Sequence, residues 1–391
     1  KDDLKVIDQM KEKKKDCIFI MKGSIFFKAP SELLNSLDLK NIDFLIGGEI
    51  EFAAVNIIEK INFNKNNFHE IPGIFTRSDN KWIESEFDNW NKEIDDLPFP
   101  NRKKIKNELY FRPDTGEPQA TIATSRGCPS ACVYCLTPTI SGKKTRFRAP
   151  KSILKEMEDC YFNHGIKNFF FKSDTFTINH QWVKDVCESI NSSELKNKIE
   201  WVANSRVRPL HEDTPKIMRE AGCWLIAFGF ETGSEETIKK IKKGATVQEN
   251  LKAAELVRNA GIKIYGFFLV GLPWENLEHL SDTEKHMFEI NSDFIELHIA
   301  VPYYGTELYN IAKSEGLLKV PVVGQNYFEE ATTGTKFLTA KQLISWRKKV
   351  LFKYHTRPNY IFDKFKDSFT DKRKFFNYAK HGLKLYKNLL R

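Results

Sequence analysis

The sequence predicts an α/β protein with a parallel sheet. From about residue 118 onward, runs rich in β-branched and aromatic residues alternate with stretches whose apolar residues recur at three- and four-residue intervals. Six such strand-then-helix units follow one another, which predicts a parallel sheet because each helix returns the chain to the start of the next strand. Two packings stay open on this pattern alone, a doubly wound sheet and a partial barrel.

The elements of this larger unit follow from their apolar patterns. Its expected strands are Gln119–Thr124, Asn168–Ser173, Ile199–Asn204, Trp224–Phe230, Lys263–Val270 and Asp293–Ala300. Its expected helices, each amphipathic, are Lys151–His164, His180–Ile190, Thr214–Ala221, Val247–Ala260 and Leu277–Ile290. Gly165 and Gly261 follow two of these helices, at the position where a helix commonly ends.

Residues 1–75 predict a separate, smaller α/β unit. Its expected elements are a strand at Asp16–Met21, a helix at Pro30–Leu37, a strand at Phe44–Ile46 and a helix at Ala53–Ile61. Residues 76–117, which contain the run Leu97-Pro98-Phe99-Pro100, are expected to be a linker strapped across the larger unit. The larger unit is expected over residues 118–320, and a basic helical region over residues 321–391.

The composition indicates a folded protein with a large core. The chain is 41% apolar and 29% charged, which is typical of a globular protein. Seven cysteines, three of them close together, fit a reducing compartment and not a disulfide framework. No apolar run approaches the about 18 residues of a membrane span and no secretory leader is recognised, so a cytoplasmic location is expected.

The net charge of +9 is unevenly distributed. Residues 339–391 contain 15 Lys and Arg against three Asp, a local balance of +12, so the preceding residues sum to −3. Aromatic residues are interleaved with these charges. A solvated basic face is the favoured interpretation, peripheral membrane or lipid contact is the alternative, and nucleic-acid binding is not expected.

Three cysteines form the most specific motif of the chain. Cys128, Cys132 and Cys135 have the spacing Cys-x3-Cys-x2-Cys, with no fourth cysteine nearby. Because a [4Fe–4S] cluster has four irons, three thiolates leave one iron without a protein ligand. Catalytic metal sites keep such a position open for a substrate or cofactor. A structural zinc site is the alternative, although zinc ribbons usually show two Cys-x2-Cys knuckles.

This motif, with Tyr134 before its last cysteine, resembles the signature of the radical S-adenosylmethionine (SAM) superfamily. The resemblance implies a (β/α)6 partial barrel whose first loop binds the cluster through Cys128, Cys132 and Cys135. It also implies that SAM binds the open iron and that one electron cleaves SAM to methionine and a 5′-deoxyadenosyl radical. An electron donor such as a flavodoxin or ferredoxin is then expected.

Polar residues follow several of the expected strands, where such barrels place their chemistry. The resemblance implies that Asp174 hydrogen-bonds the ribose or amino group of SAM, and that Arg206 pairs with its carboxylate through two parallel bonds. Glu231 lies in Gly-Phe-Glu-Thr-Gly-Ser, similar to the Gly-x-Glu-x-Gly-Ser segment of the family, and is expected to bind the ribose hydroxyls or the amino group.

The remaining expected SAM contacts lie on the same segments. Gly233 is expected to let the backbone approach the ligand, and Ser234 completes the Gly-x-Glu-x-Gly-Ser segment. Leu269 belongs to Gly266–Pro273, which resembles the segment flanking the adenine. Tyr134 is expected to fill the cluster loop and to contact the adenine.

The N-terminal unit resembles the back half of a cobalamin-binding domain, a partial Rossmann-like α/β domain, fused ahead of a radical SAM barrel. The strand ends Gly23-Ser24 and Gly47-Gly48-Glu49 and the Leu-Pro-x-Pro segment are typical of that class. The resemblance therefore implies cobalamin contacts at Gly23, Ser24, Gly47, Gly48 and Glu49. A complete domain is longer and can carry an Asp-x-His-x-x-Gly motif that is missing here, so a truncated or degenerate domain is expected.

These features together predict a cobalamin-class radical SAM enzyme that methylates an unactivated carbon of a small-molecule or lipid substrate. The alternatives are a cobalamin-independent radical SAM enzyme that performs cyclisation, oxidation or rearrangement, and a non-enzymatic iron–sulfur or zinc binding module. A tRNA methylthiotransferase would need further N-terminal cysteines, but only Cys17 precedes the motif. No residue is assigned to catalysis on the substrate itself.

Overall fold

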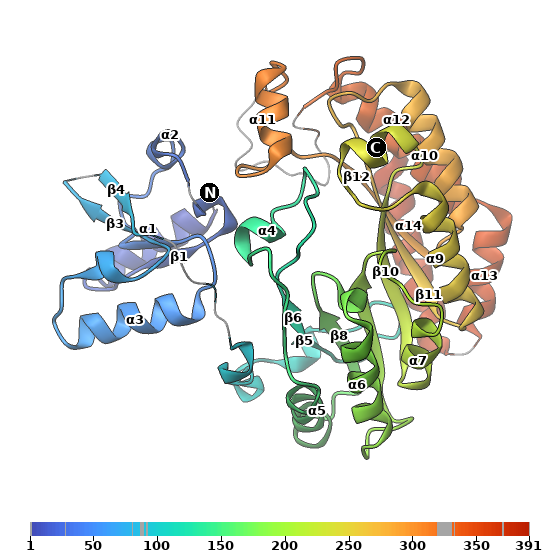
Figure 1. The fold of residues 1–391 in the computed structure, drawn as a ribbon, viewed down its shortest axis with the longest axis horizontal. Helices are drawn as coiled ribbons and strands as arrows, with labels where there is room; N and C mark the ends of the chain where they lie inside the picture. The colour runs from blue at the N-terminus through green and yellow to red at the C-terminus, as the bar shows by residue number, and fades with distance from the viewer. Residues whose placement is uncertain are drawn as a thin grey trace.

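The computed structural model describes residues 2–27, 29–79, 81–86, 90, 93–318, 331, 333–369 and 371–390. A small N-terminal unit (blue) lies beside a larger unit built on a long sheet, and the C-terminal helices (orange to red) cover the far side (Figure 1). The predicted α/β class, with a parallel sheet and a helical C-terminal region, is confirmed. The expected boundary at residues 320 and 321 lies outside the described residues.

The larger unit contains a six-stranded sheet in which neighbouring strands are parallel and follow chain order. Its strands are β5 (Gln119–Ala123), β8 (Asn168–Lys172), β9 (Glu200–Ser205), β10 (Cys223–Glu231), β11 (Lys263–Val270) and β12 (Phe294–Ile299). The connecting helices are α5 (Pro150–Glu158), α6 (His180–Asn191), α7 (Thr214–Glu220), α8 (Glu235–Lys240), α9 (Val247–Asn259) and α10 (Leu277–Ile290). All six expected strands and all five expected helices are present, with ends shifted by a few residues.

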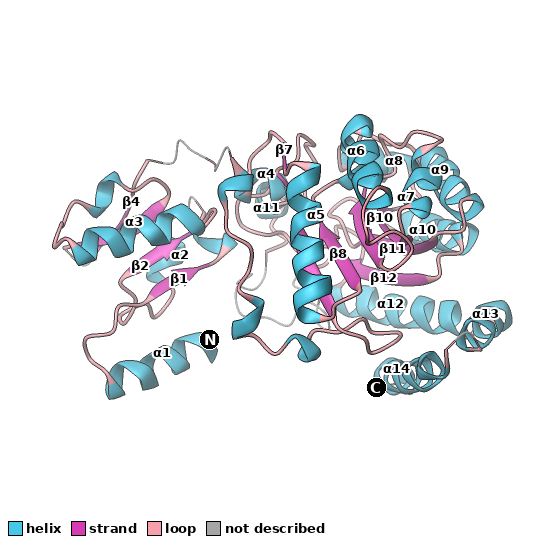
Figure 2. Cartoon of the chain, turned by 90° about the horizontal axis from the view of Figure 1, so that it is seen from below, coloured by secondary structure: helices cyan, strands magenta, loops and turns pink. Residues whose placement is uncertain are grey.

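The two faces of this sheet differ in burial. In β11, Ile264, Phe268 and Val270 are buried, whereas the alternate residues Tyr265 and Phe267 are half-buried. Since alternate residues of a strand face opposite sides, one face packs under the connecting helices and the other is an inner face. Helices α6 and α9 lie on one side of the sheet, and α12 (Ala340–His355) and α14 (Lys372–Leu390) lie on the other (Figure 2).

The N-terminal unit is a four-stranded sheet with three helices. Its strands, in order, are β1 (Ile20–Lys22), β2 (Phe44–Ile46), β3 (Ile74–Ser78) and β4 (Lys81–Glu84), and its helices are α1 (Asp2–Lys13), α2 (Ser31–Asn35) and α3 (Glu51–Asn62). Strands β1 and β2 are parallel, and the other pairs are antiparallel.

Strands β3 and β4 were not expected, because the linker was placed after residue 75. The sheet crosses that boundary: Gly73 has a φ of +73°, and after this turn Ile74 and Phe75 pair with β2 and are buried. The later part of the expected linker lies against the larger unit. There, Arg102 is buried and bonds Glu156 of α5 at 3.1 Å.

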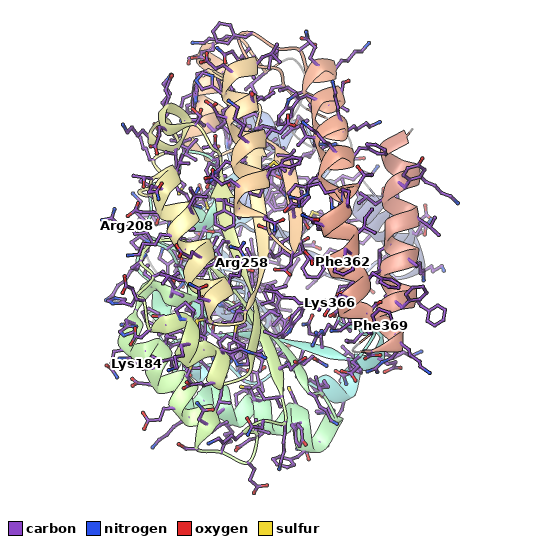
Figure 3. The ribbon with its side chains drawn as sticks, turned by 90° about the vertical axis from the view of Figure 1, so that its right-hand side faces the viewer. Lys184, Arg208, Arg258, Phe362, Lys366 and Phe369 are labelled. Carbon is purple, nitrogen blue, oxygen red and sulfur yellow. The ribbon has the colours of Figure 1, made fainter. Side chains whose placement is uncertain are left out.

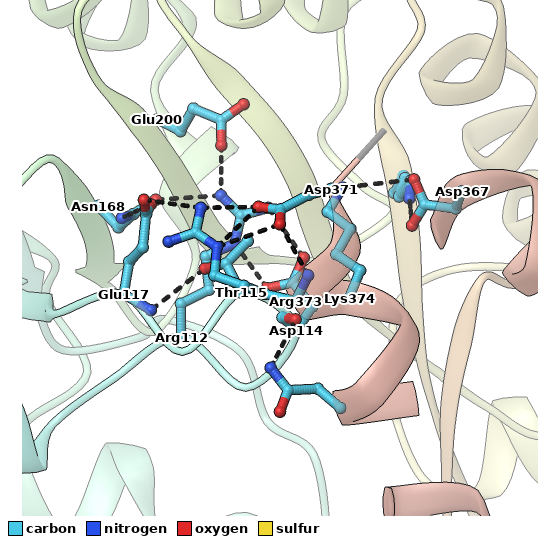
Figure 4. A network of polar contacts seen from close by, with 12 residues as sticks. Arg112, Asp114, Thr115, Glu117, Asn168, Glu200, Asp367, Asp371, Arg373 and Lys374 are labelled. Carbon is cyan, nitrogen blue, oxygen red and sulfur yellow. Dashed lines mark hydrogen bonds and ion pairs between the residues drawn. The ribbon is translucent and has the colours of Figure 1, made fainter. Parts of the chain in front are cut away.

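The C-terminal region comprises α12, α13 (Pro358–Ser368) and α14. Tyr354 of α12 is fully buried, and its hydroxyl donates to the Ser292 carbonyl at 2.8 Å. A polar network joins α14 to the strand starts: Arg373 bonds Glu117 at 3.1 Å, and Asn377 donates to the Asp114 carbonyl at 2.9 Å (Figure 4). These bonds hold α14 against the end of the sheet at which the strands begin.

The aromatic residues of this basic region divide between two environments. Tyr354, Tyr360 and Tyr378 pack toward the sheet, whereas Phe362 and Phe369 are exposed beside Lys366 on the outer side of α13 (Figure 3). The favoured interpretation, aromatics packed inward and lysines in solvent, is therefore correct for only part of the region. No helix among the described residues is long and apolar enough to span a membrane.

Candidate functional site

The three motif cysteines lie on the loop that leaves β6 (Ser125–Arg126) and leads into α4 (Thr137–Ile140). Cys128 and Cys132 are buried and Cys135 is half-buried. Gly127, which precedes the first cysteine, has a φ of +91°, and a Cβ there would lie 2.3 Å from the Lys144 carbonyl oxygen. This contact requires glycine and shows how tightly residues 141–148 cover the loop.

Two of the four basic residues of that covering segment pair with carboxylates. Arg146 donates to Glu49 at 2.7 and 3.0 Å, and Arg148 bonds Glu156 at 2.5 Å. Unpaired, these arginines would add positive potential at the cysteine loop. Their pairing with carboxylates reduces that effect for these two arginines.

The cysteine loop forms one wall of a pocket of about 190 Å³. The pocket is also lined by residues at the carboxyl ends of four consecutive strands, β8 to β11, so the topology of a parallel sheet brings them together. The sequence-predicted residues that line it are Cys128, Cys132, Tyr134, Cys135, Asp174, Arg206 and Glu231.

Arg206 bridges two parts of this pocket. Its Nη1 donates to the Sγ of Cys132 at 3.2 Å, and its Nη2 donates to the Lys243 carbonyl oxygen. Burial opposes the charge of the guanidinium, but the neighbouring Cys132 sulfur outweighs it and raises the pKa of Arg206. The arginine is therefore a fixed cation beside one of the thiols.

Glu231 lines the pocket and lies at the irregular end of β10. The pairing of β10 with β11 shifts between Gly229 and Glu231, and Glu231 has a φ of +66°, uncommon for a residue with a side chain. Its Oε1 accepts a bond from the Nζ of Lys243 at 2.6 Å, and the two side chains are 11% and 5% exposed. Burial, followed by the Glu231 carboxylate, raises the pKa of Tyr134 well above its ordinary value.

Asp174 ties the end of β8 to the cysteine loop. Its Oδ2 accepts a bond from the backbone N–H of Gly127 at 2.8 Å, and its Oδ1 accepts one from Thr137 at 3.4 Å. The carboxylate thus orders both ends of the loop that carries the cysteines, in addition to facing the pocket.

Three predicted SAM contacts lie outside the pocket lining. A Cβ on Gly233 would lie 2.3 Å from the Asp282 carbonyl oxygen, so this glycine permits close packing on α10. The Ser234 Oγ accepts from the Thr237 backbone N–H at 3.2 Å and caps α8. Leu269 packs in an apolar cluster that includes Tyr134.

Other pocket residues were missed by sequence reasoning. Lys243 follows α8 in a run of lysines, and nothing in the sequence distinguishes it from its exposed neighbours. Asn204 of β9 and Phe267 of β11 lie on the inner face of the sheet. The alternation of faces along each strand could have identified them, but we did not use it.

The expected cobalamin contacts of the N-terminal unit lie at one sheet edge. The carboxyl ends of β1 and β2 are adjacent, because the Gly23 N–H donates to the Ile46 carbonyl at 3.0 Å. The residues that follow these strands are Gly23, Ser24, Gly47, Gly48 and Glu49. Gly47 packs against the backbone of Phe27, which a Cβ would approach to 2.3 Å.

This edge faces the cysteine loop. Besides its two bonds with Arg146, Glu49 lies 3.5 Å from Arg126, and Glu51 bonds Arg126 at 2.5 Å. Arg126 directly precedes the Gly127-Cys128 turn. The two units are thus joined by ion pairs next to the cysteines.

The donor set of the pocket fits an iron–sulfur cluster. Three thiols, the ligands that such clusters use, come from one loop, and the carboxylates opposite them bond to Gly127 and Lys243. Within the described ranges, no three His, Cys, Asp or Glu side chains are grouped to hold a single metal ion. Thiolates that bind separate irons of one cluster do not need such a grouping.

Comparison with known proteins identifies the domain around this pocket. Residues 122–287 match the family model described as the Radical SAM superfamily, whose members use a [4Fe–4S] cluster and SAM. The chain is 28% identical over 323 residues to "Uncharacterized methyltransferase PH0819" of Pyrococcus horikoshii, covering 82% of this chain and 69% of that protein. It is 26% identical over 331 residues to an anaerobic magnesium-protoporphyrin IX monomethyl ester cyclase of Cereibacter sphaeroides, covering 81% and 53%.

Two solved structures share the fold. OxsB, described as a cobalamin-dependent SAM radical enzyme with aqua-cobalamin and SAM bound, has a TM-score of 0.69 at 15% identity, covering 99% of this chain and 61% of that one. The radical SAM methyltransferase TsrM of Kitasatospora setae, with cobalamin and a [4Fe–4S] cluster bound, has a TM-score of 0.65 at 17% identity, covering 81% and 61%. These comparisons give no support for membrane contact by the C-terminal region.

Proposed function

Because residues 122–287 form a radical SAM domain, we propose that the chain binds a [4Fe–4S] cluster through Cys128, Cys132 and Cys135, and SAM in the adjoining pocket. When bound, the cluster and SAM supply the reductive cleavage that produces a 5′-deoxyadenosyl radical. The observation that supports this most directly is that one pocket unites the three thiols with polar residues from successive strand ends. In this proposal the six-stranded sheet is the (β/α)6 partial barrel of the family.

The residues of the pocket then have distinct roles. Asp174 holds the cysteine loop through the Gly127 N–H, so that the thiols keep their positions. Arg206 offers a planar pair of donors to a carboxylate, and Glu231 offers an acceptor for an amino or hydroxyl group. Lys243 bonds Glu231 and offsets its negative charge.

For the overall reaction we propose cobalamin-dependent methylation of an unactivated carbon. The names of several relatives support this, among them PH0819 and a bacteriochlorophyllide d C-12(1)-methyltransferase of Chlorobaculum tepidum. The ion pairs of Glu49 and Glu51 also support it, because they place the strand-end edge of the N-terminal unit beside the cysteine loop. That edge, from Gly23 and Ser24 to Gly47 and Gly48, is the proposed cobalamin contact.

Cyclisation is the second candidate reaction. Proteins named anaerobic magnesium-protoporphyrin IX monomethyl ester cyclase match over much of this chain, at 26% identity in Cereibacter sphaeroides and 23% in Synechocystis. The chain spans 53% and 62% of the length of those two proteins. Methylation and cyclisation are therefore both proposals for the reaction of the whole protein.

The test is the absorption spectrum of the full chain, produced with cobalamin and reconstituted anaerobically with iron and sulfide. Cluster absorption and reductive SAM cleavage are expected, and both should be lost in Cys132→Ala. The matched control is Cys17→Ala, because this half-buried thiol lies outside the pocket. Cluster and cleavage retained in Cys132→Ala would contradict the cluster assignment, and the absence of corrinoid bands from the wild type would contradict cobalamin dependence.

A further inference from the structure

A second and larger cavity lies between the sheet and the C-terminal helices. Its volume is about 710 Å³, within the range of pockets that enclose small molecules. Gln119, Trp224 and Phe294 contribute from the starts of their strands, and Tyr360 and Tyr378 contribute from α13 and α14. Most of the lining is aromatic or aliphatic, so the cavity suits a largely apolar molecule with rings.

This cavity adjoins the cysteine pocket along the inner face of the sheet. In β9, Val202 lines the cavity and Asn204 lines the pocket. In β11, Tyr265 lines the cavity and Phe267 lines the pocket. Residues two apart on a strand share a face and are about 7 Å apart. Between these pairs, β10 presents the small side chain of Ala227, which lines the cysteine pocket, and Leu225, which lines the cavity.

One cation in the cavity, Lys364, lies among aromatic rings. The Lys364 Nζ lies 3.6 Å from the centroid of the Phe294 ring and within 5.6 Å of two tyrosine rings. Among the residues that the structure describes, it makes no hydrogen bond and no ion pair. Burial lowers its pKa to about 8, which leaves it protonated at neutral pH. Aromatic faces offset only part of the cost of a buried charge.

The carboxylates around Lys364 accept hydrogen bonds from other groups, and Asp293 attracts the Lys364 charge without contacting it. Asp367 accepts from Lys263 and Tyr378 at 2.6 and 2.7 Å, and Asp293 accepts from the Ile264 N–H at 2.9 Å. The Nε and Nη2 of Arg112 donate to the two carboxylate oxygens of Asp114 (Figure 4). Because no carboxylate among the described residues contacts Lys364 directly, its amine can take an anion in this cavity.

We propose that this cavity is the substrate chamber of the enzyme, and that its substrate is a ring-bearing, largely apolar carboxylate. The carboxylate pairs with Lys364, and the molecule extends past Ala227 toward the cysteine pocket, where its reacting carbon lies. Lys364 is thus a specificity-determining residue. The proposal rests on the proposed radical SAM function, since it assigns the reacting carbon to that pocket.

The test is a fluorescence titration of the full chain with pyrenebutyrate, a ring-bearing carboxylate, and with its uncharged methyl ester. The wild type should bind the acid at least about tenfold more tightly than the ester, and Lys364→Met should lose this preference. Lys366→Met is the matched control, because this lysine is on the same helix but points outward (Figure 3), and it should bind like the wild type.

The outcomes separate this proposal from the proposed function. No binding of the acid by the wild type, equal binding of acid and ester, or an unchanged preference in Lys364→Met would each overturn the substrate assignment. The titration needs neither cluster nor SAM, so failure of the cluster assignment would leave it measurable. Lys364→Met should also keep the cluster absorption of the wild type, since Lys364 does not line the cysteine pocket.

Discussion

Arg206 donates a hydrogen bond from Nη1 to the Sγ of Cys132 at 3.2 Å, although the two residues are 74 positions apart in the sequence. The bond joins the end of β9 to the cysteine loop. It places a permanent cation beside a thiol proposed as a cluster ligand, and the second donor of the same guanidinium holds the Lys243 carbonyl. The geometry of this arginine therefore affects both the loop and the proposed SAM site.

Arg206→Lys should weaken SAM binding while the cluster still forms. Lysine keeps the charge but lacks the planar pair of donors that matches a carboxylate. The loss of a charge-assisted hydrogen bond corresponds to about tenfold or more in the dissociation constant, measured by equilibrium dialysis of SAM with the reconstituted protein. Arg208→Lys is the control, because Arg208 is exposed and pairs with Glu249. Equal effects of both substitutions would contradict the role of Arg206.

The ion pair of Glu231 and Lys243 should show strong energetic coupling. Glu231→Gln leaves the buried Lys243 charge without its partner, and Lys243→Met does the same to Glu231. Each substitution should lower the free energy of unfolding by about 3–5 kcal/mol, whereas the double variant should lose less than the sum. Urea unfolding of the four proteins measures the coupling. Additive losses would show that the two side chains do not stabilise each other.

Much of the cysteine pocket was predictable because its residues follow strands. Asp174, Arg206 and Glu231 stand within two residues of the ends of the expected strands, and parallel strands end at one sheet edge. That rule needs only the strand pattern and the order of the chain. It does not specify which strand-end residues point inward, so Gly233 and Ser234 were expected in the pocket but pack against α10 and cap α8.

Other features depend on packing that the sequence does not display. Lys243 and Lys364 are lysines among many, and their places in the two cavities follow from how segments distant in the sequence pack together. Strand β4 (Lys81–Glu84) has four residues that do not alternate between apolar and polar, so periodicity gave no signal. Its place is determined by its pairing with β3. Exposed Phe362 and Phe369 could not be separated from the packed aromatics by composition alone.

Gly127→Ala should destabilise the cysteine loop. The added Cβ would lie 2.3 Å from the Lys144 carbonyl oxygen, and the residue has a φ of +91°. We expect reduced iron content after reconstitution, measured by iron and sulfide assays. Gly165→Ala is the matched control: its φ is +66° and nothing lies within 4 Å of the new Cβ, so only the backbone cost of about 1 kcal/mol applies. Equal iron content in the two variants would contradict the proposed contact.

The titration of the Glu275 carboxyl should lower the free energy of unfolding as the pH rises. Burial raises the pKa of this carboxyl to about 7, although it accepts bonds from the Gly271 and Leu272 N–H groups at 2.7 and 3.0 Å. Between about pH 4.5 and 7 the folded state therefore binds more protons at this site than the unfolded state. The free energy of unfolding falls across that window by up to about 3 kcal/mol.

Glu275→Gln isolates this effect, because the amide oxygen can accept the same two backbone bonds without titrating. The comparison with Glu275→Gln is needed because His286 has the opposite effect. Burial lowers the pKa of His286 to about 4, which makes the free energy of unfolding rise with pH between about 4 and 6.5. His286 is present in both proteins, so its contribution cancels in the difference. Urea unfolding at pH 5 and pH 8 should show that the stability of the wild type relative to Glu275→Gln is lower at pH 8. A pH-independent difference would mean that Glu275 does not titrate in this window.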